Sequence, residues 1–257
     1  APFAAKKGWV DQCQLWRNRY PVVLPKYWER QNYVNPYCFV DELFRHLDKD
    51  DVVVCGNATA CVCTYQAAFI RKGQRIYSNS GSASMGYDLP AAIGATIAEP
   101  GRRVICLAGD GSIQMNLQEL QTIQTYNLPI KIFILNNQGY HSIRQTQNNF
   151  FGEPLIGCCQ GQDINFPDMS KIAFAYNYIF FRVHDHVDLA ETIRKVLSEP
   201  NAAICEVMLT TEQAFAPKPS SVKLPDGRII SRPLEDQAPF LDREEFRQNM
   251  IIDTLNE

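Results

Sequence analysis

The chain has 257 residues, of which 46% are hydrophobic and 21% charged, and its formal net charge is −3. This length suits one sizeable α/β domain with extra segments, or two small domains. The balanced charge leaves no basic face for nucleic acid, and no run approaches the roughly 18 apolar residues of a membrane span. We therefore expect neither nucleic acid nor membrane as a partner.

The order of apolar runs along the chain predicts its elements. Residues 1–36 are rich in aromatic residues and proline, with a helix around Val10–Arg19, and helical spacing of apolar residues continues from Tyr37 to Leu47. From there strand-like runs alternate with helical stretches. The predicted strands are Asp51–Cys55, Arg75–Tyr77, Val104–Ala108, Ile130–Leu135, Ile179–Val183 and Ala203–Leu209. The predicted helices are Cys61–Arg71, Pro90–Ala98, Leu117–Tyr126, Phe166–Tyr176 and Val187–Leu197.

The alternation of strands and helices predicts the fold class. It is typical of an α/β fold with a doubly wound, mostly parallel sheet and helices on both faces. We expect a connector at residues 1–36, the α/β domain at 37–211 and a C-terminal tail at 212–257. The tail is polar and rich in proline before a terminal helix at Arg243–Leu255.

Nine cysteines are scattered along the chain, and Cys55, Cys106 and Cys205 lie in apolar runs. An odd number of buried thiols is typical of a reducing, cytoplasmic location. The first seven residues are not followed by the apolar run of a signal peptide. The pairs Cys61-Val62-Cys63 and Cys158-Cys159 lack a second pair at zinc-site spacing, so we do not expect zinc there.

One strand–helix–strand unit carries the chemistry. Its first strand ends at Gly109-Asp110-Gly111-Ser112 and its second at Asn136-Asn137-Gln138-Gly139. The carboxyl ends of parallel strands share one edge of a sheet, where ligands bind, so Asp110 and Asn137 should lie close together. A carboxylate, an amide oxygen and a backbone carbonyl suit Mg²⁺ when a ligand supplies phosphate oxygens. The unit therefore predicts a metal-bridged diphosphate site.

The alternative interpretation of Gly-Asp-Gly is a plain turn. The amides of Gly111 and Ser112 can face a phosphate, helped by the following helix N-terminus. Gly-Asp-Gly alone is more often a turn, but Asn-Asn at the end of the next strand favours the diphosphate site. Gln114 stands where a dinucleotide fingerprint needs its third glycine, and no phosphate-loop lysine is present.

Together, Gly109-Asp110-Gly111 and Asn136-Asn137 resemble the thiamine-diphosphate signature of the acetolactate synthase and pyruvate decarboxylase superfamily. The loop 80–95 resembles the acetolactate synthase segment that meets the aminopyrimidine ring. The resemblance implies that 37–211 is the C-terminal domain binding thiamine diphosphate and Mg²⁺. It also implies that 1–36 ends a linker from a middle domain.

The resemblance also implies roles for individual residues. Asp110 and Asn137 would bind Mg²⁺ through side chains and Gly139 through its carbonyl. Met85 would wedge under the cofactor, and the Ala83 carbonyl, where relatives usually have Gly, would accept the 4′-amino group. The implied cofactor-binding set is Ala58, Thr59, Ala83, Met85, Asp110, Gly111, Ser112, Asn137, Gly139, Tyr140, His141 and Ser142.

The family's catalytic glutamate lies on a pyrimidine-binding domain, and no segment here resembles it, so no catalytic residue is assigned. We expect the C-terminal part of an enzyme that decarboxylates a 2-oxo acid, pyruvate, and ligates the two-carbon unit to an acceptor. The missing domain would belong to the same enzyme or to a partner subunit. Because the family binds the cofactor between subunits, a homodimer or homotetramer is expected.

Alternatives stay open at this point. Thr146 stands where acetolactate synthases carry Trp, and Ile143 where pyruvate decarboxylases carry Glu, so the acceptor is not named. The chain could be the diphosphate-binding subunit of a split 2-oxo acid decarboxylase, or a cofactor-binding module without catalysis. An unrelated nucleotide-diphosphate domain would bind ADP equally well. His141 would contact substrate or phosphate, or, in the alternative interpretation, begin a helix, and His184-Asp185-His186 is expected on a surface loop.

Overall fold

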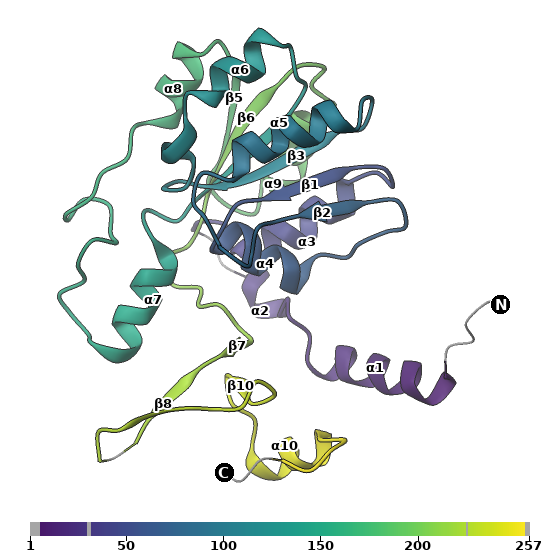
Figure 1. Ribbon diagram of the computed structural model, residues 1–257, viewed down its shortest axis with the longest axis vertical. Coiled ribbons are helices and arrows are strands. Elements are labelled where there is room, and N and C mark those ends of the chain that lie inside the picture. Colours follow the sequence, from purple (N-terminus) through teal and green to yellow (C-terminus); the bar gives the residue numbers. More distant parts are fainter. Residues whose placement is uncertain (1–5, 30–31, 225, 255–257) are drawn as a thin grey trace. The chain divides into compact units, whose positions relative to one another are not determined.

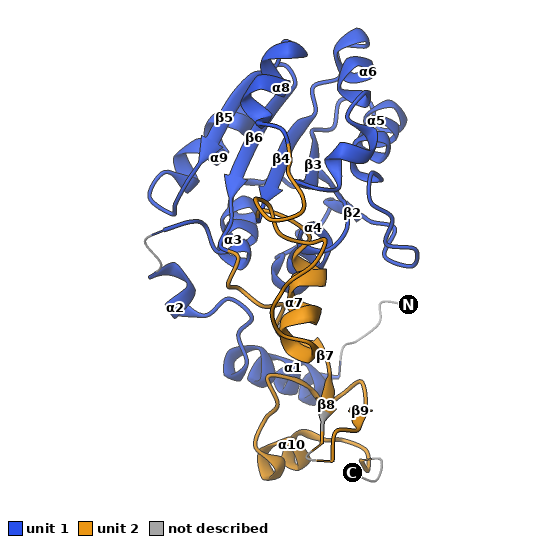
Figure 2. Ribbon diagram, turned by 90° about the vertical axis from the view of Figure 1, so that its left-hand side faces the viewer, with its two compact units in different colours: residues 1–137, 167–210 blue, residues 138–166, 211–257 orange. Residues whose placement is uncertain are grey.

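A computed structural model describes residues 6–29, 32–224 and 226–254. The chain forms two compact units, unit 1 (residues 1–137 and 167–210) and unit 2 (residues 138–166 and 211–257), coloured blue and orange in Figure 2. The start of the predicted connector (residues 1–5) and Leu255, the end of the predicted terminal helix, lie outside the described residues. The three segments expected from the sequence stay a prediction.

A parallel sheet forms the centre of unit 1. Its strand order within the described residues is β2-β1-β3-β4-β6-β5, with every neighbouring pair parallel. The α/β fold class expected from the sequence is therefore confirmed. The strands are β1 (Val52–Cys55), β2 (Arg75–Tyr77), β3 (Val104–Gly109), β4 (Lys131–Asn136), β5 (Ile179–Val183) and β6 (Ala203–Met208).

Helices cover both faces of this sheet (Figure 1). Because successive side chains point to opposite faces, alternate residues of β1, β3 and β4 serve different cores. Val52, Cys106 and Ile132 pack with one set of helices, and Phe133 faces Phe39 on the other side. The first set is α5 (Asp88–Ala98), α6 (Glu119–Thr125) and α8 (Met169–Ala175), and the second is α3 (Pro36–His46), α4 (Thr59–Ala67) and α9 (Leu189–Ser198).

The strand order reverses at the carboxyl edge between β1 and β3. From β1 the chain passes through α4 to β2 on one side, and then through α5 to β3 on the other side of β1. This reversal splays the loops that leave β1 and β3, and open α/β sheets bind ligands at such a point. We therefore expect ligand-binding residues in the segments that follow Cys55 and Gly109.

The predicted helices differ from the observed ones mainly at their ends. The helix predicted at Phe166–Tyr176 begins at Met169, because the Asp168 side chain accepts a hydrogen bond from the Ser170 amide and caps it. The helix predicted to start at Cys61 begins two residues earlier, at Thr59. A 3₁₀ turn, η1 (Ile113–Asn116), precedes α6.

The connector consists of α1 (Lys7–Arg19) and α2 (Pro25–Trp28). Its end is held by His186, whose Nε2 accepts a hydrogen bond from the Asn35 amide at 2.9 Å. The Trp28 ring lies 5.3 Å from the same imidazole. His186 thus has a structural role beside the connector.

Unit 2 combines one longer helix with short antiparallel pairs. Its elements are α7 (His141–Phe150), β7 (Lys218–Pro219), β8 (Ser221–Lys223), β9 (Ile229–Ser231), β10 (Gln237–Ala238) and α10 (Arg243–Asn249). β7 pairs with β10, and β8 with β9. The buried Asp236 receives two hydrogen bonds from Arg243, at 2.9 and 3.0 Å, which tie the start of α10 to the chain before it.

All nine cysteines lie in the described part of the chain, and each is a free thiol. Seven of them are buried, including Cys55, Cys106 and Cys205. None of the helices in the described ranges combines the length and apolar character that a membrane crossing needs.

Truncating a residue at the contact between β4 and α3 tests the packing. Phe39 is fully buried against Phe133, with ring centroids 5.6 Å apart. We predict that Phe39→Ala lowers the free energy of unfolding by about 3–5 kcal/mol in urea titrations, because it leaves a cavity. The matched control is Phe174→Ala on α8, where the ring is 85% exposed, with an effect within about 0.5 kcal/mol. Equal losses of unfolding free energy in the two variants would contradict a buried contact between Phe39 and Phe133.

Candidate functional site

The loops that follow β1, β3 and β4 form the candidate site in unit 1. The Gly56 amide donates to the Leu107 carbonyl at 2.8 Å, and the Asp110 amide to the Leu135 carbonyl at 3.4 Å. These bonds keep the three strand ends in register as the chain leaves the sheet. Asp110 and Asn137 are only 3% and 5% exposed.

One hydrogen bond joins the two outer loops. The side-chain Nδ2 of Asn137 donates to Thr59 Oγ1 at 2.9 Å, in a buried position. Thr59 follows β1 and Asn137 follows β4, and β3 lies between these strands. Neighbouring strands are about 4.8 Å apart, so this bond has to cross above the end of β3, where Asp110 is located. The structure therefore brings the predicted Thr59, Asp110 and Asn137 together.

These side chains offer oxygen atoms suited to a hard cation. The Asp110 carboxylate accepts a hydrogen bond from the Gly111 amide at 2.9 Å, which orients it. Gln114 Nε2 donates to the Asp110 carbonyl at 3.1 Å and fixes the turn. A carboxylate and an amide oxygen fit Mg²⁺ when phosphate oxygens complete its coordination, so the donor set fits the predicted metal.

The start of α4 offers backbone amides to an anion. Ala58 precedes this nine-residue helix with φ 47° and ψ −121°, and no side chain in the described structure caps it. A non-glycine residue at positive φ is strained and is common where a backbone approaches a ligand closely. The uncapped helix start and its dipole favour a phosphate group.

The loop between β2 and α5 carries the next two predicted residues. Ala83 has φ 49°, a left-handed conformation that glycine adopts most easily. The positive φ of this residue is the physical reason why the family that the sequence resembles usually has glycine at this position. The Ala83 carbonyl accepts a hydrogen bond from Asn57 Nδ2 at 3.3 Å, which links this loop to the segment after β1. Met85 is 40% exposed, so its apolar side chain is available to a ligand.

A buried carboxylate that the sequence analysis missed joins these loops. Ser112 donates to Asp88 Oδ2 at 2.6 Å, and the Gly86 amide donates to the Ser112 hydroxyl at 3.0 Å. A Cβ on Gly56 would lie 2.8 Å from the same Asp88 oxygen, so the end of β1 makes room for it. Asn116 Nδ2 adds a bond of 2.7 Å to the Gly86 carbonyl.

Asp88 is fully buried, and burial raises the pKa of its carboxyl above the ordinary value, although the bonds from Ser112 and the Leu89 amide oppose this. A sequence signal existed, because Asp88 is a charged residue at the start of an otherwise apolar helix. Only the fold shows that it faces Ser112 rather than solvent.

The remaining predicted residues, 139–142, belong to unit 2. Gly139 has φ 137°, and a Cβ there would lie 2.0 Å from the Cys158 carbonyl oxygen, so only glycine fits. The Tyr140 amide donates to that same carbonyl at 2.9 Å. Ser142 is half-buried as the second residue of α7.

His141 begins α7 and is buried. Its Nε2 lies 2.7 Å from the Gln213 carbonyl, which can only accept, so Nε2 carries the proton. Burial lowers the pKa of His141, the hydrogen bond to the Gln213 carbonyl opposes this, and the nearby Arg144 and Lys218 lower the pKa further. The Phe215 ring meets the imidazole edge-on at 5.1 Å. His141 thus joins α7 to the first part of the tail within unit 2.

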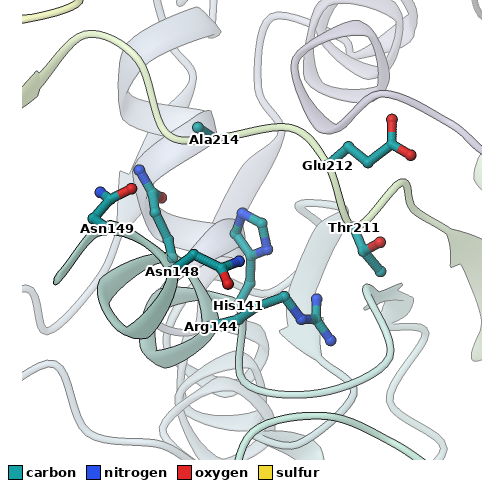
Figure 3. A pocket seen from close by; sticks show the side chains of 8 residues that line it. His141, Arg144, Asn148, Asn149, Thr211, Glu212 and Ala214 are labelled. Carbon is teal, nitrogen blue, oxygen red and sulfur yellow. The ribbon is translucent and has the colours of Figure 1, made fainter. Parts of the chain in front are cut away.

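A pocket of about 320 Å³ lies beside this contact, lined almost wholly by polar side chains (Figure 3). In the figure, the His141 ring extends from α7 toward the segment that carries Thr211 and Ala214. The lining residues are His141, Arg144, Gln145, Asn148, Asn149, Thr211, Glu212 and Ala214.

The fold and the loops of unit 1 define a class of protein, an α/β domain with a candidate cofactor site at the carboxyl edge of its parallel sheet. Residues 55–207 match the family model described as thiamine pyrophosphate enzyme, C-terminal TPP binding domain. The chain therefore belongs to the thiamine pyrophosphate enzymes, which confirms the resemblance expected from the sequence.

Curated relatives agree with this assignment. The chain is 33% identical over 214 residues to the acetolactate synthase large subunit of Cyanidium caldarium, covering 82% of this chain and 35% of that protein. The chloroplastic acetolactate synthase of Arabidopsis thaliana is 29% identical over 213 residues, covering 81% and 31%. The chain spans about a third of the length of the relatives it matches.

Two glycine substitutions test the arrangement around Asp88. At Gly56 a new Cβ would meet Asp88 Oδ2 at 2.8 Å and the Leu107 carbonyl at 3.2 Å, and neither can move freely. We predict that Gly56→Ala lowers the free energy of unfolding by about 1–3 kcal/mol. Gly94 lies within α5 with nothing within 4 Å of the added Cβ, so Gly94→Ala should raise it by about 0.5–1 kcal/mol. A change of the same sign in the unfolding free energy of both variants would contradict the close approach of Gly56 to Asp88.

The buried Asp88 also predicts a pH dependence of stability. Its folded pKa lies above the ordinary 3.8, so the folded chain keeps this proton at pH values where the unfolded chain has lost it. The stability that this proton confers is complete below about pH 4 and is lost as pH rises through the folded pKa. We predict that Asp88→Asn, which has no proton to lose, gains in Tm relative to wild type as pH rises from 4.

The control is Asp226→Asn, because Arg228 and its backbone amide lower the pKa of this exposed carboxyl. Its Tm relative to wild type should not rise over the same range. A flat difference curve for Asp88→Asn would show that the carboxyl titrates normally.

Proposed function

We propose that this chain is the thiamine-diphosphate- and Mg²⁺-binding part of an enzyme that decarboxylates a 2-oxo acid, with pyruvate as the leading candidate. The two-carbon unit is then joined to an acceptor, as the names of the acetolactate synthase relatives suggest. The observation that carries this proposal is the Asn137–Thr59 hydrogen bond, which gathers three loops above the end of β3.

In this proposal the cation and the diphosphate share one site. Asp110 and Asn137 supply side-chain oxygens to Mg²⁺, and Gly139, two residues further along the chain, supplies its carbonyl. The amides of Gly111 and Ser112 and the uncapped start of α4 receive the phosphate oxygens. This arrangement neutralises the diphosphate charge without a lysine.

The loop before α5 orients the organic part of the cofactor. Met85 offers an exposed apolar side chain against the rings, and the Ala83 carbonyl accepts the 4′-amino group. Asp88 and Ser112 hold this loop against the phosphate-binding turn. When bound, thiamine diphosphate supplies the electron sink that lets a 2-oxo acid lose CO₂.

A second domain completes the site in this proposal. The relatives are about three times as long as the matched region, and a pyrimidine-binding domain of the same enzyme or of a partner subunit supplies the catalytic glutamate. We also propose a homodimer or homotetramer in a reducing, cytoplasmic compartment. The nine free thiols support the compartment.

Calorimetry on the chain with Mg²⁺ and thiamine diphosphate tests the proposal. We predict that Asp110→Asn and Asn137→Ala weaken cofactor binding by about tenfold or more, a loss of at least about 1.4 kcal/mol each. Asp50→Asn, an exposed carboxylate before β1 at the opposite edge of the sheet, should bind like wild type. ADP should compete weakly, because it lacks the rings that Met85 and Ala83 receive. Equal competition by ADP would favour a general diphosphate site.

The isolated chain should not consume pyruvate, because the catalytic glutamate comes from elsewhere. Turnover is restored only when the pyrimidine-binding domain is added. Appreciable CO₂ release from the chain alone would contradict the need for that domain.

A further inference from the structure

Two adjacent cysteines in unit 2 lie with their thiols in contact. The Sγ atoms of Cys158 and Cys159 are 3.7 Å apart. Cys158 is fully buried, whereas Cys159 is 8% exposed. They pack with Leu155 and Tyr140 in a small apolar cluster. Neither the fold of unit 1 nor the proposed reaction uses these thiols.

The same two residues pair with the segment that carries Gly139. Gly139 and Cys159 form an antiparallel bridge. The Tyr140 amide donates to the Cys158 carbonyl, and the Gln160 amide to the Gln138 carbonyl, each at 2.9 Å. We call these two bonds the 138–160 ladder. Because the ladder fixes the backbone on both sides of Gly139, it also fixes the direction of the Gly139 carbonyl.

Arg144 connects both sides of this ladder. Its Nη2 donates to the Gln138 carbonyl at 2.7 Å, and its Nε donates to Cys159 Sγ at 3.4 Å. A guanidinium beside a sulfur makes its surroundings electropositive, which is typical of reactive cysteines. Cys159 is therefore the thiol that meets an oxidant first, because it is the less deeply buried of the two and lies beside the Arg144 cation.

We propose that Cys158 and Cys159 form a peroxide-sensitive dithiol whose closure to a vicinal disulfide disrupts the 138–160 ladder. The consequence for Mg²⁺ binding through Gly139 rests on the proposed function, whereas the disulfide and the loss of the ladder do not. The site is a modification site for hydrogen peroxide, and it regulates the segment that follows Asn137.

The reaction balances with peroxide as the oxidant. The Cys159 sulfur attacks one peroxide oxygen, the O–O bond breaks, and the leaving hydroxide takes the thiol proton as water, which leaves a sulfenic acid. The Cys158 sulfur then attacks Cys159, the S–S bond forms, the S–O bond breaks, and the second water carries off the Cys158 proton. The two sulfurs lose two electrons in total, and one peroxide becomes two waters.

Closure changes the backbone because the ring is small. The sulfurs must approach from 3.7 Å to about 2.05 Å, and the Cα atoms of adjacent residues are about 3.8 Å apart, below the usual disulfide range of about 4.4–6.8 Å. The peptide between the cysteines has to rotate, which turns the Cys158 carbonyl away from the Tyr140 amide. A strained disulfide of this kind is readily reduced, as a reversible switch requires.

Mass spectrometry of the full chain tests the disulfide directly. Trypsin releases both cysteines in one peptide, residues 145–171, with no other cysteine. After mild peroxide treatment and alkylation, we expect this peptide to be about 2 Da lighter and to carry no alkyl group. Cys55, Cys61 and Cys63 share the peptide 50–71 and serve as the internal control, which should stay alkylated. Sulfinic acid on one cysteine, or full alkylation of both, would overturn the proposal.

Hydrogen exchange tests the ladder without any cofactor. We expect the amides of Tyr140 and Gln160 to exchange at least about tenfold faster after oxidation, and to recover after reduction with dithiothreitol. Cys158→Ala and Cys159→Ser should abolish this response, whereas Cys13→Ser on the exposed surface of α1 should retain it. Unchanged exchange in a chain that contains the disulfide would overturn the link to the ladder.

Cofactor affinity separates this inference from the proposed function. The oxidised chain should bind Mg²⁺ and thiamine diphosphate about tenfold more weakly than the reduced chain. If the reduced chain does not bind the cofactor, the proposed function fails. The mass and exchange results still test whether the disulfide forms and whether it disrupts the 138–160 ladder. If both forms bind equally well, the regulatory consequence is wrong.

Discussion

The hydrogen bond between Asn137 and Thr59 is the contact on which the candidate site depends. It links the residue after β4 to the first turn of α4, and it spans the strand that carries Asp110. Within unit 1, the chain after β1 continues into α4 on one face of the sheet and the chain after β3 into α6 on the other, so the sheet alone does not hold these loops together. The bond brings Asn137 to the start of α4 above the end of β3, and a carboxylate, an amide oxygen and a helix start are the groups that a cation with a diphosphate requires.

The buried Asp88 is the second residue that holds the loops of the candidate site together. Through Ser112 it holds the turn after β3 to the loop that carries Ala83 and Met85, and Gly56 leaves the space that it occupies. An unpaired charge in such a place would be costly, and the raised pKa of Asp88 is the physical response to burial. The two halves of a cofactor, one anionic and one aromatic, can thus be positioned by loops that are tied together beneath them.

Sequence patterns predict the sheet well, because buried parallel strands are short runs of β-branched residues. Arg75–Tyr77 matches β2 to the residue, and the Gly-Asp-Gly and Asn-Asn pair identifies two of the loops. The range of α7 is not predicted, although His141 is given as an alternative helix start, because this helix is largely polar and buries only His141 and Arg144. Asp88–Ser112 and the 138–160 ladder join residues whose pairing is set by tertiary contacts, so no local pattern reveals them.

Replacing Mg²⁺ with Mn²⁺, which prefers the same oxygen ligands, allows the distance between the cation and the diphosphate to be probed. Pulsed electron paramagnetic resonance on the chain with Mn²⁺ and thiamine diphosphate reports whether phosphorus lies next to the metal. We expect a clear ³¹P hyperfine coupling that disappears when Asp110 is changed to Asn. A bound Mn²⁺ without phosphorus coupling, or a coupling that persists in the variant, would contradict a diphosphate and cation held together at the end of β3.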